Sequence, residues 1–358
     1  MANIYQVAEL AGVSSATVSR IVNDKGVVTE KTRRKVLAAM EKLDYRPSSI
    51  AQALATNRSN CVGVLVSELY GPFYGAMLSA IEQTVRAAGK FVMVTAGHSD
   101  ETREREGLEF LVSRGCDALI VHVEALTDQY LLEQGRKSTP MVIMNRVVKG
   151  LADRCISLDN SRGGYLAARL LLQKGHKDIA YISGPLRWQD ASQRLAGHRQ
   201  ALAEAGLELD ERLLYEGNYL EESGAEGLAE LLDRGIPFSG VVCANDEMAA
   251  GAMNAARERG LNIPADLAIV GFDNAPVSRY VHPKLATVDY PIADMSRMAA
   301  QWVLKNVYDH ETVEVQHVFK PTILERESVA RIATHRRRPT VAPRELRQPR
   351  RRTSQVKR

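Results

Sequence analysis

Apolar residues recur at helical spacing near the N-terminus and predict three short helices. Residues 5–11 form the first helix, which ends at Gly12, and residues 14–23 start a second helix that Ser14 can cap. Thr29 can cap the third helix. The apolar stripe of that third helix consists of Val36, Met40 and Leu43. Two short helices joined by a tight turn with glycine predict a helix-turn-helix, whose second helix enters the major groove of DNA.

From residue 62 onward, continuous apolar runs alternate with amphipathic helical patterns. Such an alternation predicts an α/β core of parallel strands covered by helices on both faces. About eight strands fit two doubly wound lobes better than they fit one sheet. The expected strands span 62–66, 91–94, 118–121, 141–144, 155–158, 179–182, 240–243 and 268–271. The expected helices span 75–88, 103–114, 163–174, 193–205, 224–233 and 246–259.

Charge is distributed unevenly over the 358 residues, although the net charge is only +4. Residues 1–60 carry nine Lys/Arg and five Asp/Glu, and residues 331–358 carry eleven Lys/Arg and one acidic residue. The segment between them therefore has a net charge of −10. An acidic body with two basic ends is typical of a protein that places only its ends on a polyanion.

The sequence argues against several other classes of protein. No stretch approaches the ~20 apolar residues of a membrane span, and we expect no membrane partner. The helix-turn-helix pattern starts at once, so we expect no signal peptide and a cytoplasmic, nucleoid-associated protein. The four cysteines lack metal-ligand spacing, and we expect buried, reduced thiols. Because neither a glycine-rich phosphate motif nor a nucleophile–base set occurs, we expect no cofactor, no metal and no catalytic residue.

The second predicted helix carries side chains suited to contacting DNA. Two small residues lie near its start, where base edges are reached, and three short polar side chains can bind phosphates. The small residues are Ser15 and Ala16, and the polar ones are Thr17, Ser19 and Asn23. Arg20 can bind a guanine bidentately. The pattern alone is a modest signal, because other small helical segments can look like it.

Three motifs together make the N-terminal pattern specific. They are Ala11-Gly12-Val13-Ser14, Ala16-Thr17-Val18-Ser19-Arg20 and Tyr45-Arg46-Pro47. With these motifs the chain closely resembles the LacI/GalR family of bacterial repressors. Gln6 departs from the family, which usually has Asp there, but it lies in the first helix and we expect no change of function. The candidate DNA-contacting residues are Tyr5, Ser14, Ser15, Ala16, Thr17, Ser19, Arg20, Asn23, Thr29, Thr32 and Leu54.

Two further segments lie at the ends of the core, a hinge that the resemblance implies and a C-terminal tail. In the family, the segment after Pro47 is a hinge helix that forms on operator DNA and inserts a leucine into the minor groove, and Leu54 holds that position. An ordinary linker helix is the alternative. The tail 335–358 has no apolar periodicity and should be disordered. It lacks the leucine heptads of tetrameric members, so we expect a homodimer on a palindromic operator.

These patterns predict four segments. They are a DNA-binding domain at 1–46, a hinge and linker at 47–59, a two-lobed effector-binding and dimerisation core at 60–330 and a basic tail at 331–358.

Residues that directly follow strands predict a ligand pocket, because doubly wound sheets bind ligands beyond the carboxyl ends of their strands. An arginine, an aspartate, two asparagines and aromatic rings suit a neutral polyol, whose hydroxyls both donate and accept and whose apolar face can be covered. The candidates are Tyr70, Phe73, His122, Asn145, Arg194, Tyr219, Asn245 and Asp273.

The core also resembles the ligand-binding core of the LacI/GalR family, which is related to periplasmic sugar-binding proteins. Landmarks are Ser183-Gly184-Pro185, Arg194-Leu195-Ala196-Gly197, Asn245-Asp246-Glu247-Met248-Ala249 and Gly271-Phe272-Asp273. Asn145-Arg146-Val147-Val148 is most similar to the galactose repressor and isorepressor group. The resemblance implies effector contacts at Phe73, Asn145, Arg194, Tyr219, Asn245 and Asp273. For Arg194 and Asp273 the alternative is an ion pair that only closes the cleft, and for Tyr70 and His122 it is a place on the rim.

The sequence therefore predicts a repressor whose affinity for its operator is controlled by galactose or a related sugar or glycoside. A nucleoside or phosphosugar effector, or a corepressor, remains open. A free solute-binding protein is disfavoured by the DNA-binding module, and an enzyme is disfavoured by the lack of a nucleophile–base arrangement.

Overall fold

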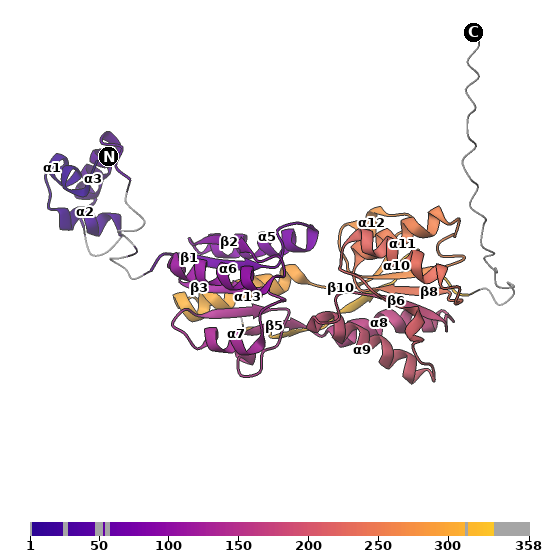
Figure 1. Cartoon of the computed structure of the whole chain (residues 1–358). Helices are drawn as coiled ribbons and strands as arrows, with labels where there is room; N and C mark the ends of the chain where they lie inside the picture. The colour runs from indigo at the N-terminus through magenta and orange to yellow at the C-terminus, as the bar shows by residue number, and fades with distance from the viewer. Residues whose placement is uncertain (1, 24–27, 47–52, 54–57, 312–313, 333–358) are drawn as a thin grey trace, which may run out of the picture.

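The computed structural model describes residues 2–23, 28–46, 53, 58–311 and 314–332. Its N-terminal unit consists of three helices (Figure 1), which are α1 (Ile4–Ala11), α2 (Ser15–Val22) and α3 (Glu30–Lys42). The apolar faces of the helices share a small core around Val7, Val18 and Val36, all fully buried. The three predicted helices are confirmed.

Side chains cap each of these helices at its N-terminus. The hydroxyls of Ser14 and Thr29 each accept a hydrogen bond from the backbone N–H three residues later, at 3.2 and 3.3 Å, as predicted. Asn3 caps α1 in a capping box, in which Gln6 Oε1 accepts a hydrogen bond from the Asn3 N–H. Gln6, which departs from the family pattern, therefore stabilises the start of α1.

The first lobe is built on a six-stranded parallel sheet with the order β11-β5-β4-β3-β1-β2. Its strands are β1 (Cys61–Val66), β2 (Phe91–Ala96), β3 (Ala118–Val121), β4 (Met141–Met144), β5 (Cys155–Leu158) and β11 (Val318–Phe319). Alternate residues of β1 face opposite layers, so Val64 packs with α5 (Pro72–Ala87) and α13 (Ile292–Tyr308). Leu65 packs on the other face with α6 (Glu101–Ser113) and α7 (Asp128–Gly135).

The second lobe contains a sheet with the order β12-β10-β9-β8-β6-β7. Its strands are β6 (Ile179–Ser183), β7 (Leu214–Glu216), β8 (Gly240–Cys243), β9 (Ala268–Asp273), β10 (Ala286–Asp289) and β12 (Thr322–Leu324). Only β12 is antiparallel to its neighbour. The helices of this lobe are α8 (Asn160–Gln173), α9 (Gln189–Glu204), α10 (Glu221–Asp233), α11 (Asp246–Glu258) and α12 (Val277–Tyr280). Helices α8 and α9 pack against each other, as do α10 and α11.

The chain passes between the lobes three times, after β5, after β10 and between β11 and β12 (Figure 1). Each passage leaves one sheet and enters the other lobe without a long connection. The first passage leads directly into Asn160 at the start of α8, and the second leads through Tyr290 into α13. Both residues therefore lie where the lobes join.

All eight predicted strands are present, and so are the six predicted helices. The sequence prediction missed four strands, β7, β10, β11 and β12, which have only two to four residues each. The runs of β7, β11 and β12 are below the length at which an apolar run predicts a strand. Strand β10 has four residues, but Thr287 and Asp289 interrupt its apolar run. The sequence prediction also missed α7, α12 and α13, although the buried positions of α13 follow a helical period.

Three of the four cysteines are buried, and all four are free thiols. Cys61 is only half-buried, which corrects the prediction that all of them are buried. Every helix in the described part of the chain is too short or too polar to cross a membrane.

Candidate DNA-binding and effector-binding sites

Helix α2 presents one face to solvent and one to the small core. Val18 and Ile21 are buried, whereas Ala16 and Arg20, one helical turn apart, are exposed. Ser15, Thr17 and Ser19 are half-exposed beside this face. The arrangement brings the predicted base-contacting residues together on the open side of α2.

Several of the candidate DNA-contacting residues bind one another. The Ser14 and Thr17 hydroxyls lie 2.9 Å apart, and Asn23 Nδ2 donates to the Ser19 carbonyl oxygen at 2.8 Å. The Thr29 and Thr32 hydroxyls also lie 2.9 Å apart. Tyr5 is 71% exposed on α1. Leu54 lies outside the described residues, so its predicted role stays a prediction.

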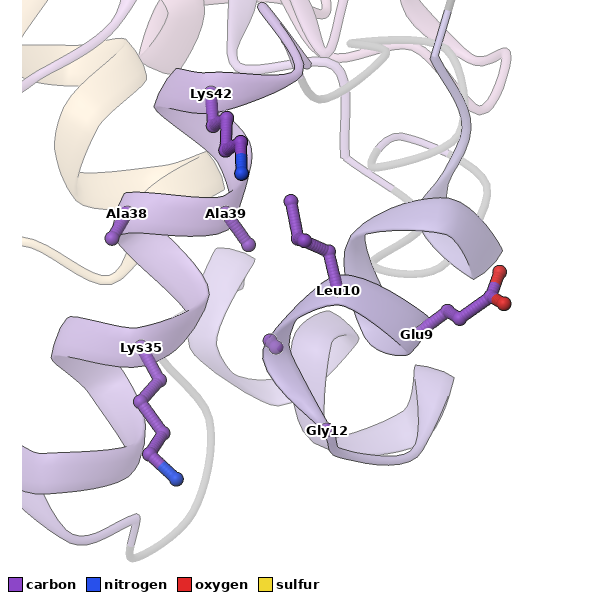
Figure 2. Close-up of a pocket in the computed structure, with 8 residues that line it drawn as sticks. Glu9, Leu10, Gly12, Lys35, Ala38, Ala39 and Lys42 are labelled. Atoms are coloured by element: carbon purple, nitrogen blue, oxygen red, sulfur yellow. The ribbon is translucent and has the colours of Figure 1, made fainter.

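A pocket of ≈ 510 Å³ lies between α1 and α3 (Figure 2). It is lined by Glu9, Leu10, Ala11, Gly12, Lys35, Ala38, Ala39 and Lys42. None of the candidate DNA-contacting residues belongs to this lining, so the pocket is separate from the exposed face of α2.

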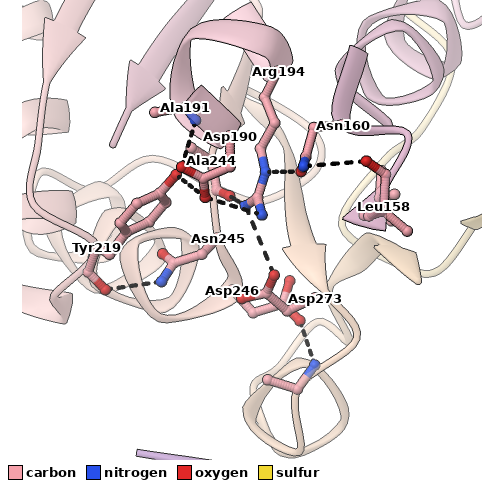
Figure 3. Close-up of polar contacts among 12 residues, drawn as sticks. Leu158, Asn160, Asp190, Ala191, Arg194, Tyr219, Ala244, Asn245, Asp246 and Asp273 are labelled. Carbon is pink, nitrogen blue, oxygen red and sulfur yellow. Dashed lines mark hydrogen bonds and ion pairs between the residues drawn. The ribbon is translucent and has the colours of Figure 1, made fainter. Parts of the chain in front are cut away.

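In the core, Arg194 of α9 lies at the centre of a buried polar cluster (Figure 3). Its Nε donates to Asn160 Oδ1 at 2.9 Å, and its Nη1 donates to the Ala244 carbonyl oxygen at 2.6 Å. The guanidinium also lies 3.8 Å above the ring centroid of Phe272. Only 3% of Arg194 is exposed, so its charge depends on these partners and on nearby carboxylates.

Two carboxylates face the Arg194 guanidinium at distances longer than a hydrogen bond. Asp190 Oδ2 lies 3.5 Å from Nη2, and Asp273 Oδ1, at the end of β9, lies 3.8 Å from Nη1. The Tyr219 hydroxyl donates to Asp190 Oδ2 at 2.9 Å. Both carboxylates therefore retain oxygen lone pairs that can accept hydrogen bonds from a ligand.

Asparagines extend this cluster to neighbouring elements. Asn245 Oδ1 caps α11 by accepting the Met248 N–H at 2.9 Å, and its Nδ2 donates to the Tyr219 carbonyl oxygen at 2.8 Å. Asn160 Nδ2 donates to Asn145 Oδ1 at 3.3 Å and so links the cluster to the end of β4 in the first lobe. We call these residues the Arg194 cluster: Asn145, Asn160, Asp190, Arg194, Tyr219, Asn245 and Asp273.

Two glycines allow α8 and α9 to approach closely enough to build this cluster. A Cβ on Gly164 would lie 1.9 Å from the Arg194 carbonyl oxygen, and a Cβ on Gly197 would lie 1.8 Å from the Ser161 carbonyl oxygen. A larger residue at either position would separate the two helices and move Arg194 away from Asn160. The local sequence therefore sets the position of the guanidinium.

Aromatic rings from both lobes lie beside the Arg194 cluster. The Phe73 ring of α5 contacts the rings of Tyr290 and His122, with centroids 5.2 and 5.8 Å apart. Trp188 stacks on Tyr219 at 5.8 Å. Among the described residues, the Tyr290 hydroxyl and both ring nitrogens of His122 are buried without a hydrogen-bond partner. Buried polar groups are rarely left unpaired, and a ligand bound here could pair them.

Three residues of the cluster have a left-handed backbone, which costs side-chain-bearing residues ~1–3 kcal/mol each. They are Asn145 (φ +58°), Tyr219 (φ +70°) and Asp273 (φ +107°). Asn145 directly follows β4, Tyr219 lies shortly after β7, and Asp273 is the last residue of β9. Strained conformations of this kind concentrate at binding sites, where the surrounding structure holds them in place.

Burial dominates the electrostatics of the cluster. It raises the pKa of Asp273 to about 7, although the nearby Arg194 opposes the shift. Burial and the charge of Asp190 raise the pKa of Glu124 well above its ordinary value. Burial lowers the pKa of His122 to about 4, so this ring is neutral near pH 7.

Comparisons with known proteins find relatives of both the N-terminal unit and the core. Residues 3–48 match the family "Bacterial regulatory proteins, lacI family", and residues 168–329 match "Periplasmic binding protein-like domain". The chain is 42% identical over 330 residues to the HTH-type transcriptional regulator GalR of Salmonella typhimurium (strain SL1344), covering 92% of this chain and 96% of GalR. The chain belongs to the LacI family.

Two further members extend the comparison. The HTH-type transcriptional repressor PurR of Proteus mirabilis is 35% identical over 338 residues, covering 92% of this chain and 97% of PurR. The crystal structure of the lac repressor dimer bound to operator and the anti-inducer ONPF is 29% identical with a TM-score of 0.82, covering 92% and 99% of the two chains. As a LacI-family member with this helix-turn-helix, the chain is a DNA-binding transcriptional regulator.

The structure brings together five of the eight predicted effector residues of this LacI-family core within the Arg194 cluster. They are Asn145, Arg194, Tyr219, Asn245 and Asp273. Phe73 contacts Tyr290, whose ring centroid lies 5.8 Å from the Arg194 guanidinium, and His122 contacts Phe73. Tyr70 does not join them, because it is 81% exposed.

Sequence reasoning missed Asp190, Asn160 and Tyr290. Asp190 lies four residues before Arg194, and that spacing places both side chains on the same face of a helix. Asn160 follows β5, so the strand-end rule that selected Asn145 could have found it. Tyr290 follows β10, a strand that the apolar pattern did not predict.

Proposed function

We propose that the protein is a homodimeric repressor whose operator affinity falls when a neutral sugar, galactose or a related sugar or glycoside, binds at the Arg194 cluster. The observation that carries this proposal is the combination of one buried guanidinium with two incompletely paired carboxylates and several amides. We further propose that it acts at the nucleoid, where its operator lies.

The cluster matches the hydrogen-bonding needs of a polyol. Each sugar hydroxyl can donate one hydrogen bond and accept others, so it pairs best with a site that offers both donors and acceptors. Arg194 donates, Asp190 and Asp273 accept, and the asparagine amides do both. Rings such as Phe73 and Tyr290 can cover the apolar face of a pyranose.

The charges of the site disfavour a phosphosugar. Asp190 and Asp273 lie 3.5 and 3.8 Å from the Arg194 guanidinium, so its cationic charge is already opposed by acidic groups. A phosphate would need an excess of donors and positive charge. A nucleoside or purine effector remains the second candidate, because the PurR repressor is also a relative and the stacked Trp188 and Tyr219 rings could hold a base.

Two observations support a dimer. The lac repressor relative is a dimer on its operator, and the first lobe of this chain has an exposed apolar edge strand. Strand β2 lies at the edge of its sheet and exposes Phe91 (60%) and Val94 (39%). An exposed apolar edge strand offers unpaired backbone groups and apolar surface to a partner. A second copy of the chain would bury both and would give the twofold symmetry that a palindromic operator requires.

The division into segments at 1–46, 47–59, 60–330 and 331–358 is part of this proposal, as are the contacts assigned to α2 and to Leu54.

Leu54→Ser should weaken operator binding and reduce DNA bending while leaving sugar affinity nearly unchanged, because an apolar side chain is needed to wedge between base steps and bend DNA. DNA circular-permutation assays measure this, and equal bending by mutant and wild type would remove Leu54 from the role.

Calorimetry of the full-length protein tests the effector. The titrants are galactose, glucose, a purine nucleoside and galactose 1-phosphate. We expect heat from galactose, a weaker but measurable affinity for galactose in Asp273→Asn, and no binding of the phosphosugar. Tight nucleoside binding without sugar binding would replace the sugar by the second candidate.

A further inference from the structure

The linker that follows the hinge is held to the first lobe by one carboxylate. Asp117 Oδ1 accepts hydrogen bonds from the Ser59 N–H at 2.8 Å and the Ser59 hydroxyl at 3.0 Å, and Oδ2 accepts one from the Asn60 N–H at 2.8 Å. The Tyr308 hydroxyl of α13 donates to the same Oδ2 at 2.8 Å. Lys90 donates to Asn60 Oδ1 at 2.7 Å.

We call Ser59, Asn60, Lys90, Asp117 and Tyr308 the linker anchor. Ser59 and Asn60 of the anchor lie directly before the first strand of the core, on the side of the chain that leads to the DNA-binding unit. Charged hydrogen bonds to a carboxylate are stronger than neutral ones, so the anchor fixes where the linker leaves the lobe. A change here alters the attachment of the DNA-binding unit.

Two thiols border the linker anchor, one on each side of its hydrogen bonds. Cys61 follows Asn60 in the chain, and Cys116 precedes Asp117. The Asp117 N–H donates to the Cys61 carbonyl oxygen at 2.8 Å, and the next residues, Val62 and Ala118, pair in parallel register. Cys61 therefore lies opposite Asp117, and Cys116 lies one residue before it. Adjacent parallel strands are about 4.8 Å apart and rise about 3.3 Å per residue, so the two cysteine Cα atoms are about 6 Å apart, within the range that a disulfide spans.

The two side chains meet in the same apolar layer. Both pack with the core cluster that contains Leu119. The neighbouring Cys116 thiol lowers the pKa of Cys61, against the opposing effects of burial and Asp117. Cys61 in turn raises the pKa of Cys116, together with burial. Cys61 is half-exposed and Cys116 is 5% exposed, so an oxidant can reach Cys61 first.

We propose that Cys61 and Cys116 form a thiol pair that a hydroperoxide oxidises to an intramolecular disulfide, and that this bond disturbs the linker anchor and lowers operator affinity. Cys61 and Cys116 would give the regulator a site for oxidation. Because the measured effect is a change in operator affinity, the proposal rests on the DNA-binding function of the family, but not on the identity of the effector.

The chemistry needs only hydrogen peroxide as oxidant. The Cys61 thiolate attacks one peroxide oxygen, the O–O bond breaks, and the hydroxide that leaves takes up a proton, which gives a sulfenic acid and one water. The Cys116 thiol then loses its proton and attacks the Cys61 sulfur, the S–O bond breaks, and a second water leaves. Two thiols and one peroxide become one disulfide and two waters.

The bond disturbs the anchor because it shortens the separation of the two sulfurs. A disulfide holds them at ~2.05 Å with a fixed torsion, much closer than two thiols in contact. The side chains of Cys61 and Cys116 must turn towards each other, and the fixed torsion then constrains the backbones of residues 61 and 116, each of which is joined directly to a residue of the anchor. The hydrogen bonds from Ser59 and Asn60 to Asp117 are therefore the ones expected to weaken.

The test treats reduced full-length protein with stoichiometric hydrogen peroxide and follows two readouts, peptide mass spectrometry and operator affinity. We expect a Cys61–Cys116 disulfide and a several-fold rise in the Kd for operator, both reversed by dithiothreitol. Cys116→Ser should form no disulfide and keep the reduced affinity. Cys243→Ser, a matched control at a fully buried thiol of the second lobe, should respond like wild type.

Two results would overturn the proposal. One is that peroxide leaves both thiols reduced, or links different cysteines, in protein that binds operator normally. The other is a complete Cys61–Cys116 disulfide with unchanged operator affinity. Circular dichroism of the Cys116→Ser protein distinguishes loss of the reaction from loss of the fold, and Cys116→Ala serves if serine is poorly tolerated in this apolar layer.

Discussion

Helix α2 and the Arg194 cluster place polar side chains in opposite ways. Helix α2 exposes Ala16 and Arg20 on a face fixed by two buried neighbours, within one continuous stretch of chain. The Arg194 cluster is buried, and its members come from strand ends and helices that are far apart in the sequence. We propose that the residues of α2 gain their partners from DNA, whereas the residues of the Arg194 cluster already have partners within the protein that a bound effector would replace.

This difference predicts that the two sites respond separately to substitution. Changes on α2 should alter DNA binding and leave effector binding intact, because nothing on α2 reaches the cluster's partners. Changes in the Arg194 cluster should remove the effector response and leave operator recognition intact.

The largest effect is expected from Arg194→Ala. The substitution removes the donor to Asn160 and the countercharge of Asp190 and Asp273, and loss of one partner of a buried ion pair costs ~3–5 kcal/mol. We expect sugar affinity to fall by at least a hundredfold in calorimetry and the operator complex to persist at sugar concentrations that dissociate wild type.

Arg199→Ala is the matched control for this prediction. Arg199 lies on the same helix, is half-exposed and pairs with Glu211 at 2.7 Å, so its loss should change neither readout. Normal operator release by Arg194→Ala would mean that the guanidinium only closes the lobes.

A smaller effect is expected from Arg20→Ala. A bidentate contact to guanine contributes ~1–3 kcal/mol and sets the preference at one half-site position. Gel-shift competition should show weaker operator binding and relaxed preference at that position, with sugar affinity unchanged. Arg34→Ala, at an exposed arginine of α3 paired with Glu30, is the control. Unchanged preference in Arg20→Ala would remove it from base recognition.

The pH dependence should separate the two sites further. The pKa of Asp273 is raised from 3.8 to about 7, so the folded protein favours neutral Asp273, and that stabilisation is lost progressively as pH rises from about 4 to about 7. Sugar binding needs the ionised acceptor, so its affinity should rise about tenfold from pH 6 to 8 while the free energy of unfolding falls.

Asp273→Asn should flatten both pH profiles, since the amide does not titrate. His122 does not contribute in this window, because burial lowers its pKa to about 4. A pH profile that is the same in Asp273→Asn and wild type would assign the titration to another group.

The smallest effect on specificity is expected from deleting residues 335–358. The deletion removes ten Lys/Arg and one Glu, and each phosphate that the tail neutralises adds ~0.9 to the slope of log affinity against log salt. Binding to random DNA should weaken and become less salt-dependent, while the preference for operator and the sugar affinity stay similar. An unchanged slope would mean that the tail is inert towards DNA.

The contrast between the sites also explains what the sequence could predict. The caps Ser14 and Thr29 and the exposed position of Arg20 depend on neighbours in the chain, so motifs and helical period were sufficient. Buried strands were predicted for the same reason, because each one is a continuous apolar run.

The cluster was predicted only in part, because its contacts depend on tertiary structure. The strand-end rule found Asn145, Asn245 and Asp273. It could not show that Arg194 binds Asn160, which depends on the close approach of α8 and α9 at Gly164 and Gly197. Tyr290 depends on a short strand that carries little sequence signal.

The central claim is that operator and sugar bind to the same protein and weaken each other. Thermodynamic linkage requires that both effects have the same factor, typically 5–150-fold in allosteric proteins. The direct measurement is the Kd for galactose in the presence and absence of saturating operator. We predict a rise in Kd on adding operator, by the factor with which galactose raises the Kd for operator. Galactose binding with the same Kd whether or not operator is bound would contradict the account.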